Sequence, residues 1–431
     1  MLVQAGVPLA STPRSDEGPA LLIRCHDCDL LQQVGPLPPG ASAKCPRCAA
    51  TLFGHKPHGF ERAFVLYLAA LLLLAIANAF PFLTLKVQGQ LQSSHLISGA
   101  IDLYRRGMWE IAVAVVLFVV VFPLVKILIG LAVVGPLTFG RTIPGAHAVY
   151  RIFAALHPWA MMEIFLLGVL VAYTKLIDLA TVEFGPSLIA FVGLILATIA
   201  ADSALDPHDV WERLYRAPRV PGPDRREGRQ LLGCHCCQLV SRPPRGPSEH
   251  GALCPRCGSL LHRRKPNSID RTWALLITSA LLYIPANVYP VMTFTALGQG
   301  EPSTIIGGVK ELIAAKMWPL AAIVFVASIL VPMLKMIFLG YLLISVRRRS
   351  RWRLKDRTLI SRIVEAVGRW SMVDVFVISI LVALVQLGSL ADITPNVGIL
   401  AFASVVVLTM IAALVFDPRL MWDAAGANHE R

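Results

Sequence analysis

The stretch FVLYLAALLLLAIA, from Phe64 to Ala77, decides the class of this protein. It needs only slight extension to reach the roughly 20 apolar residues with which a helix crosses a hydrocarbon core of about 30 Å. The composition agrees, because 55% hydrophobic residues, 16% charged residues and a mean hydropathy of +0.63 lie outside the range of soluble globular domains. We therefore predict a mainly α, polytopic membrane protein with eight spans, at about residues 62–84, 109–135, 159–179, 186–205, 271–293, 318–346, 370–390 and 396–416.

The distribution of positive charge predicts the orientation of these spans. The loop RRRSRWRLKDR (Arg347 to Arg357) and the segment RAPRVPGPDRREGR (216–229) are strongly basic, and such loops stay on the cytoplasmic side. Both termini are therefore expected to be cytoplasmic. The first twenty residues lack the apolar core of a signal peptide and are predicted to be disordered. The net charge of +13 fits contact with anionic headgroups, and no nucleic-acid partner is expected.

The whole chain is a tandem duplication. Cys45-Pro-Arg-Cys48 recurs as Cys254-Pro-Arg-Cys257, and the offset of 209 residues holds as far as the second spans. After two inserted residues, WAMMEIF from Trp159 matches WSMVDVF from Trp370 at an offset of 211. Each half is a cysteine module and four spans, which predicts parallel repeats related by an axis along the membrane normal. The predicted segments are a disordered N-terminus (1–20), ribbon 1 (21–58), transmembrane unit 1 (59–210), a basic linker (211–229), ribbon 2 (230–267), transmembrane unit 2 (268–423) and a C-terminal tail (424–431).

Eight of the nine cysteines form two sets with the spacing of a Cys₄ zinc ribbon, in which two knuckles close a tetrahedron around one ion. The reducing cytoplasmic side disfavours disulfides, and no βαβ pattern supports a redox site, whereas iron in place of zinc stays open. Four protein ligands leave no position for water, so the two Zn²⁺ ions are predicted to be structural. Cys236 is unmatched. The predicted ligands are Cys25, Cys28, Cys45 and Cys48, and Cys234, Cys237, Cys254 and Cys257.

Both halves also carry N-x-x-P, P-x-x-K, W-x-M-x-(E/D)-x-F and D-P-x-x-x-W, in that order. With the two ribbons, this pattern resembles the paraquat-inducible protein A family of bacterial inner-membrane proteins, from Cys25 to about Asp423. The resemblance implies tetraspanin-like units, a periplasm-spanning MCE-domain partner, and a part in moving phospholipids between the inner and outer membranes. The sequence departs from the pattern at Cys236, and His147 and Arg151 stand where the second half has its Arg-rich run.

Ionisable residues inside a membrane are costly and are therefore functional candidates. By depth along their helices, Lys126 is predicted to pair with Glu163, and Lys335 with Asp374. Two interpretations remain open: fixed ion pairs that order the bundle, or a relay for protons or lipid headgroups, which we favour for the second half. The predicted network comprises Lys126, Glu163, Thr198, Lys335, Ser371, Asp374 and Thr409.

Prolines are expected to kink the first and second spans, and the preceding asparagines to bond carbonyls that the prolines free. The predicted kink residues are Asn78, Pro81, Pro123, Asn287, Pro290 and Pro332. Tryptophans 109, 159, 318 and 370 are predicted interfacial anchors at span ends. Residues 98–109 and 306–318 are amphipathic and are predicted to form surface helices before the second spans.

Three functions remain open: a subunit of a lipid-transport system, a stand-alone ion-coupled transporter, and a membrane sensor of metal or oxidative stress. The second lacks clustered ligands within the spans, and Cys236 mildly favours the third. The sequence contains no P-loop motif and no nucleophile–base constellation, so enzymatic activity is not expected.

Overall fold

The computed structural model of this protein describes residues 21–87, 90–176, 181–215, 231–242, 252–296, 299–314, 316–384 and 391–426. The predicted disordered N-terminus (1–20), most of the basic linker (211–229) and most of the tail (424–431) lie outside these residues. The side chain of Asp374 lies outside the described part as well.

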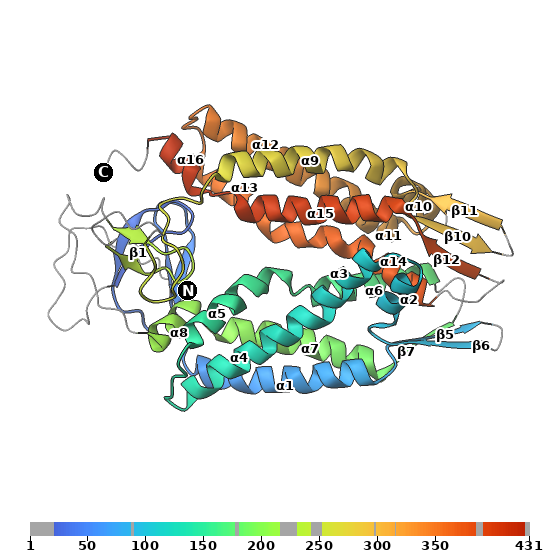
Figure 1. Ribbon diagram of the computed structural model, residues 1–431, viewed down its shortest axis with the longest axis horizontal. Helices are drawn as coiled ribbons and strands as arrows, with labels where there is room; N and C mark the ends of the chain where they lie inside the picture. Colours follow the sequence, from blue (N-terminus) through green and yellow to red (C-terminus); the bar gives the residue numbers. More distant parts are fainter. Residues whose placement is uncertain are drawn as a thin grey trace.

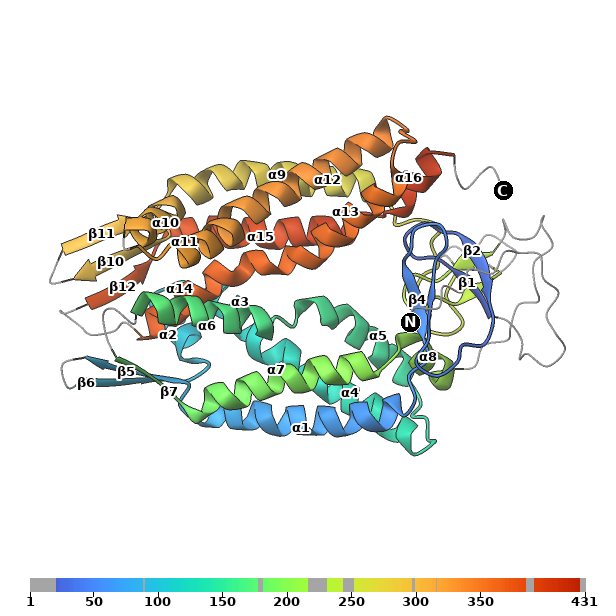
Figure 2. The ribbon, with the colours of Figure 1, turned by 180° about the vertical axis from the view of Figure 1, so that it is seen from behind.

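Two helical units lie side by side, with both cysteine ribbons at one end and two small β-sheets at the other (Figures 1 and 2). Within the described residues, seven helical segments are long and apolar enough to cross a membrane. The eighth predicted span is the less apolar helix α9 (Ser268–Val288). It packs along α15 (Val397–Val415) as α1 (Gly59–Ala79) packs along α7 (Pro186–Ala204). The two halves therefore run in the same direction, as predicted for parallel repeats.

The second and third spans are each made of two helices joined by an irregular turn. In unit 1 they are α3 (Trp109–Val116), η1 (Leu117–Val121) and α4 (Phe122–Thr138), then α5 (Ala146–Leu156), η2 (His157–Trp159) and α6 (Met162–Leu176). In unit 2 they are α11 (Trp318–Phe325), η4 (Val326–Leu330) and α12 (Val331–Arg347), then α13 (Leu354–Val367), η5 (Gly368–Met372) and α14 (Val373–Leu384).

The third spans begin earlier than predicted, at Ala146 and Leu354. Their first helices, α5 and α13, carry charged residues, so apolarity alone placed the starts too late. Trp159 and Trp370 consequently lie at 3₁₀ turns inside the spans, and the prediction that they mark span ends is wrong.

The first spans end before their prolines. Helix α1 stops at Ala79 and α9 at Val288, because Pro81 and Pro290 offer no N–H to continue the helix. The expected kinks at these two prolines are therefore helix ends. Asn78 donates to the carbonyl of Leu74 (2.8 Å), and the carbonyl of Ala77, four residues before Pro81, accepts from Ser187 of α7. Asn287 likewise donates to the carbonyl of Tyr283 (2.8 Å).

The chain after each first span forms a strand, which the prediction of helical units did not include. Strand β5 (Leu83–Val87) lies between β6 (Gln90–Ser94) and β7 (Thr181–Phe184), and β10 (Met292–Ala296) lies between β11 (Gln299–Ser303) and β12 (Ala391–Pro395), all antiparallel. Their apolar residues continue the apolar runs of the spans, which is why the predicted spans overran.

In the second spans, Pro123 and Pro332 are the second residues of the helices that follow a π-helical turn. The wider turn accommodates the hydrogen bond that a proline cannot donate, and single π-turns of this kind are frequent at functional sites. Lys126 and Lys335 each lie one turn further along, so the irregular backbone and the buried lysine occur together in both halves.

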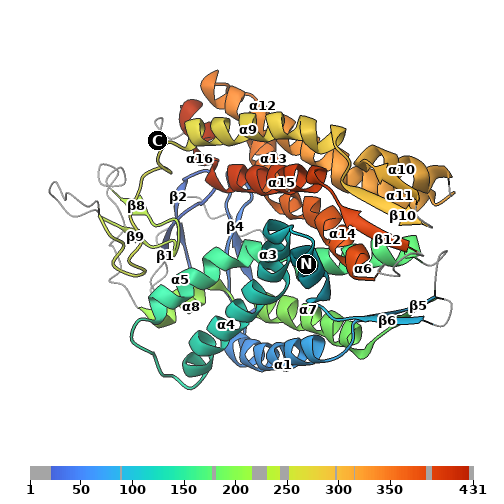
Figure 3. The ribbon, with the colours of Figure 1, turned by 45° about the vertical axis from the view of Figure 1, so that its right-hand side comes forward.

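Helices α2 (Ser98–Arg105) and α10 (Ile305–Ala314) confirm the two amphipathic helices. Helix α2 packs on α14, and α14 packs on α6, so the third spans form much of the contact between the units (Figure 3). The approach is close at Gly99, where a Cβ atom would overlap the carbonyl oxygen of Ser379.

Candidate functional site: two cysteine clusters and two buried lysines

Each Cys-x-x-Cys knuckle is closed by the same backbone turn. After Cys28 and Cys48, the residues Asp29 and Ala49 take positive φ angles of 60° and 57°, and their N–H groups donate to the carbonyl oxygens of Cys25 and Cys45 (2.9 and 2.8 Å). Gln238 and Gly258 repeat this turn in ribbon 2. Short hairpins carry the knuckles: β1 (Leu21–Arg24) with β2 (Leu31–Val34), β3 (Ser42–Lys44) with β4 (Thr51–Gly54), and β8 (Leu232–Gly233) with β9 (Val240–Ser241).

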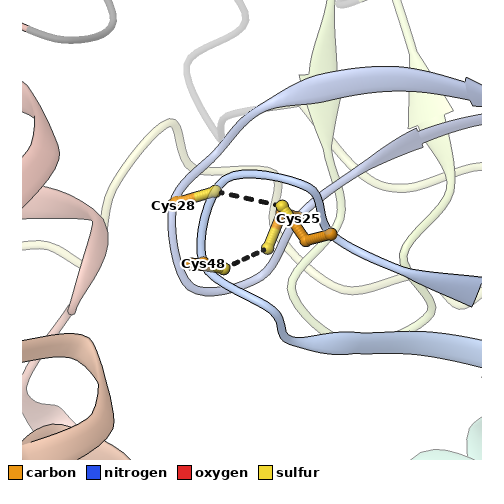
Figure 4. Close-up of side chains that lie close together, drawn as sticks. Cys25, Cys28 and Cys48 are labelled. Atoms are coloured by element: carbon orange, nitrogen blue, oxygen red, sulfur yellow. Dashed lines mark hydrogen bonds between the residues drawn. The ribbon is translucent and has the colours of Figure 1, made fainter. Parts of the chain in front are cut away.

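The predicted ligands converge in two buried clusters, and in each the four sulfur atoms lie within 4.8 Å of one another. The distance is 3.5 Å between Cys25 and Cys48 Sγ, and 3.6 Å between Cys28 and Cys45 Sγ, so the thiols are not joined as disulfides. Figure 4 shows Cys25, Cys28 and Cys48 turned toward one another. Tetrahedral Zn–S bonds of about 2.3 Å require sulfurs about 3.8 Å apart, so the thiols fit one ion per cluster.

Each ribbon is held by the third span of the opposite unit. In ribbon 1, Asp27 and the Cys48 carbonyl accept from Arg362 of α13 at 2.6 and 3.0 Å. In ribbon 2, the Cys257 carbonyl accepts from Arg151 of α5 at 3.5 Å. Arg151 and Arg362 are equivalent at the offset of 211, as Cys48 and Cys257 are at 209. Each ribbon therefore contacts the transmembrane unit of the other half, and the two contacts are equivalent under the internal repeat.

Aromatic and charged side chains add to the contacts between ribbon 1 and the second half of the chain. Trp422 of α16 (Arg419–Ala424) packs in the apolar core of ribbon 1, and Arg47 lies over its ring at 5.0 Å. Arg264 donates to Asp29 of ribbon 1 (2.8 Å) and to Asp423 of α16 (2.5 Å). Burial alone would lower the pKa of Arg264, but its bonds to Asp423 and the charge of Asp29 outweigh burial and raise it. The ribbons and both units thus form one assembly.

In unit 1, the buried lysine has a carboxylate partner, but not the predicted one. Lys126, 4% exposed, donates to Asp202 of α7, and the Tyr67 hydroxyl donates to the same carboxyl group at 2.8 Å. Glu163 is exposed, so the predicted Lys126–Glu163 pair is wrong. Asp202 lies within the predicted fourth span, so the sequence already indicated an acid inside the membrane at this position. Thr198 donates only to carbonyls of its own helix.

In unit 2, the equivalent lysine has neutral partners. Lys335, 2% exposed, donates to the Thr409 hydroxyl (2.8 Å) and the Gly368 carbonyl (3.2 Å), and no carboxylate pairs with it among the described side chains. The Ser371 and Ser328 hydroxyls are buried without a hydrogen-bond partner in the described part of the chain. Ser328 was not predicted from the sequence. The position equivalent to Asp202 is Ala413, so the fourth span of unit 2 carries no acid at this place in the repeat.

The metal sites give a first prediction. Elemental analysis of the purified protein should find two transition-metal ions per chain, and one after the double substitution Cys25→Ser/Cys28→Ser, because two thiolates no longer close the tetrahedron. Cys236→Ser is the control and should retain both ions, since Cys236 belongs to neither cluster. A metal content near zero in the unsubstituted protein would contradict the assignment of the clusters as metal sites.

The Lys126–Asp202 pair gives a second prediction. Asp202→Asn should lower the free energy of unfolding in detergent by about 3–5 kcal/mol, because the substitution leaves a buried ammonium group uncompensated. Adding Lys126→Met should recover most of this loss, since no unpaired charge then remains. A double-mutant cycle of denaturation midpoints measures the coupling. Additive effects would show that the pair does not stabilise the unit.

Comparisons with known proteins extend over almost the whole chain. The family model described as paraquat-inducible protein A matches residues 60–215 and 269–426, which are the two transmembrane units. The chain is 36% identical to the intermembrane transport protein PqiA of Escherichia coli K12 over 93% of this chain and 95% of that protein. It is 32% identical to the lipophilic envelope-spanning tunnel protein A of the same strain, over 95% and 92%. It is 26% identical to a probable intermembrane transport protein of Haemophilus influenzae, over 94% and 96%. No solved structure matches the chain significantly.

Proposed function

Because this chain belongs to the paraquat-inducible protein A family of polytopic membrane proteins, we propose that it is the inner-membrane component of a system that moves phospholipids between two membranes. The proteins to which it is similar are named intermembrane transport protein and lipophilic envelope-spanning tunnel protein, and the similarity covers nearly their whole length. This proposal includes the cytoplasmic placement of both ribbons and termini, on the strength of the basic segments at 216–229 and 347–357.

The observation that carries the proposal is the difference between the two buried lysines. In unit 1 the charge of Lys126 is matched by Asp202, an arrangement suited to a fixed structural role. In unit 2, the described partners of Lys335 are neutral, and the hydroxyls of Ser371 and Ser328 are buried without a described hydrogen-bond partner. Buried hydroxyls without a partner are costly within a membrane and favour a polar ligand, and beside a lysine a lipid phosphate has the right charge. Lys335, Ser371, Asp374 and Thr409 are the proposed headgroup or proton path.

The four-thiolate sites are proposed to hold zinc in a structural role. Zinc prefers tetrahedral thiolate sites, and four protein ligands leave no open position for substrate chemistry. The residues that hold it are the eight clustered cysteines, and its contribution is to staple modules too small to form a core of their own. The ribbons then hold the third spans in place through Arg151 and Arg362.

The sheets β5–β7 and β10–β12 lie at the end opposite the ribbons, together with α2 and α10 (Figure 1). If the ribbons are cytoplasmic, this end faces the periplasm. We therefore place the docking site of the proposed MCE-domain partner there, on the paired sheets and the amphipathic helices.

The test is purification of the full chain in mild detergent, followed by mass spectrometry of the lipids and proteins that remain bound. The proposal expects a stoichiometric phospholipid and an MCE-domain protein, and expects the lipid to be lost with Lys335→Met. A protein that retains neither lipid nor partner, and whose metal content follows its redox state, would contradict the transport role and support a sensor.

A further inference from the structure

A pocket of about 590 Å³ lies on the ribbon side of unit 2, at the contact between the two halves. Its walls come from ribbon 2, the first turn of α9, the last turn of α15 and the α5 helix of unit 1, which lies beside β8 and β9 (Figure 3). The lining residues include Arg151, Leu260, Lys265, Arg271, Leu414 and Arg419. The pocket therefore has basic and apolar walls and no acidic lining residue.

Two of the pocket's cations are available to a ligand. Arg151 makes one hydrogen bond of 3.5 Å, to the carbonyl of Cys257, and neither Arg151 nor Arg271 forms an ion pair with a described acid. The other cations are engaged. Lys265 caps α15 through the carbonyls of Leu414 and Phe416 (2.6 and 3.1 Å), and Arg419 binds Asp417 (2.8 Å).

Arg419 and Asp417 form a stable ion pair. Burial alone would raise the pKa of Asp417, but the bonds and charge of Arg419 outweigh burial and lower it. The charge of Arg419 is therefore already matched within the protein, and Arg151 and Arg271 carry the unmatched charge of the pocket.

The internal repeat explains why Arg151 has no acidic partner among the described residues. Its equivalent, Arg362, binds Asp27 of ribbon 1 at 2.6 Å, but the position equivalent to Asp27 in ribbon 2 is Cys236. A thiol replaces the carboxylate, so the guanidinium of Arg151 loses its acidic partner. Cys236, the ninth cysteine, thus stands at the position where an acid would complete the ion pair with Arg151.

The first half has a corresponding pocket of about 700 Å³, but its lining includes an acid, Glu61, beside Arg62. In the first half, Phe53 of ribbon 1 stacks on His208 with ring centroids 4.9 Å apart. Their equivalents in the second half are His262 and Arg419, and Arg419 is drawn away to Asp417. The second half therefore lacks this ring stack, and His262 and Arg419 line its pocket instead.

We propose that this pocket binds the phosphodiester headgroup of an anionic phospholipid from the leaflet on the ribbon side. The last turn of α15 ends a span, so the pocket lies where hydrocarbon gives way to headgroups. Two arginines match the phosphate by charge and by hydrogen-bond geometry, and Leu260, Leu414 and Val415 offer apolar walls to the glycerol and upper acyl chains. This inference does not depend on the transport proposal, because the pocket is separate from Lys335.

Native mass spectrometry of the full chain in neutral detergent tests the proposal, with phosphatidylglycerol and phosphatidylcholine added in parallel. Phosphatidylglycerol should bind preferentially, and Arg151→Ala/Arg271→Ala should weaken its binding by about tenfold or more. Cys236→Asp should have the same effect, because it restores to Arg151 the acid that Arg362 has in Asp27. Arg62→Ala, at the position equivalent to Arg271, is the matched control and should bind as the unsubstituted protein does.

Unchanged phosphatidylglycerol binding in both substituted proteins would overturn the proposal. Displacement of the lipid by equimolar inorganic phosphate would assign the pocket to a free anion and overturn it as well. Metal content and thermal midpoint confirm that each variant is folded, and Arg271→Ala alone decides the result if Cys236→Asp loses its metal. Lys335→Met should remove only the lipid of the proposed transport site and keep the phosphatidylglycerol that depends on Arg151 and Arg271, so the two proposals can fail separately.

Discussion

Lys335→Met should abolish function while the protein remains folded. Methionine fills a similar volume, but it removes the hydrogen bonds to Thr409 and Gly368 and the only charge that the described side chains place in this cluster. Hydrogen bonds to charged groups contribute about 1.5–3 kcal/mol, which corresponds to a loss in headgroup affinity of about tenfold or more. The measurement is the survival, in the presence of detergent, of bacterial cells whose envelope depends on this protein.

The matched control is Lys126→Met/Asp202→Asn in unit 1. It removes both charges of a pair that we assign a structural role, so survival should stay close to that of the unsubstituted protein. Equal loss of function in both variants would show that the two halves do not differ in the way proposed.

Loss of metal from one ribbon should loosen the third span of the other unit. With Cys25→Ser/Cys28→Ser, amide exchange should rise strongly in α13, because Arg362 loses Asp27 and the Cys48 carbonyl as fixed partners. With Cys234→Ser/Cys237→Ser the rise should occur in α5, where Arg151 contacts Cys257. Structural zinc contributes about 10–16 kcal/mol in small ribbons, so each change should unfold its ribbon outright.

Hydrogen–deuterium exchange mass spectrometry resolves the two helices. Helix α5 is the internal control when ribbon 1 is altered, and α13 when ribbon 2 is altered. Exchange that rises only in the third span of the same half as the altered ribbon would contradict the crossed arrangement.

Much of the architecture was predictable, because apolarity, repeat and cysteine spacing are local signals. The family, the helical class, the internal repeat and the two four-cysteine clusters were all confirmed. Span ends were less predictable. Strand residues such as Leu83 and Met292 continue an apolar run, while the charged residues of α5 and α13 hide the starts of the third spans.

Side-chain partners across the bundle were harder still to predict, because the depth of a residue along a helix does not indicate which face of the helix it occupies. Lys126 and Glu163 were placed at similar depth, yet Glu163 points outward and Asp202 takes the ion pair. The contact of each ribbon with the opposite unit could not be predicted from the sequence, because a tandem duplication does not indicate which unit a module packs on. Once the contacts are known, the offsets of 209 and 211 show that the crossing is symmetric.

The central claim is that lipid passes through unit 2 and not unit 1. A photo-crosslinking amino acid placed at Ser371, or at the equivalent Ala160 of unit 1, tests it in cells with radiolabelled phospholipid. The account predicts labelled lipid attached at position 371 and little at position 160. Label at position 160 alone, or at neither position with both proteins folded and inserted, would contradict it.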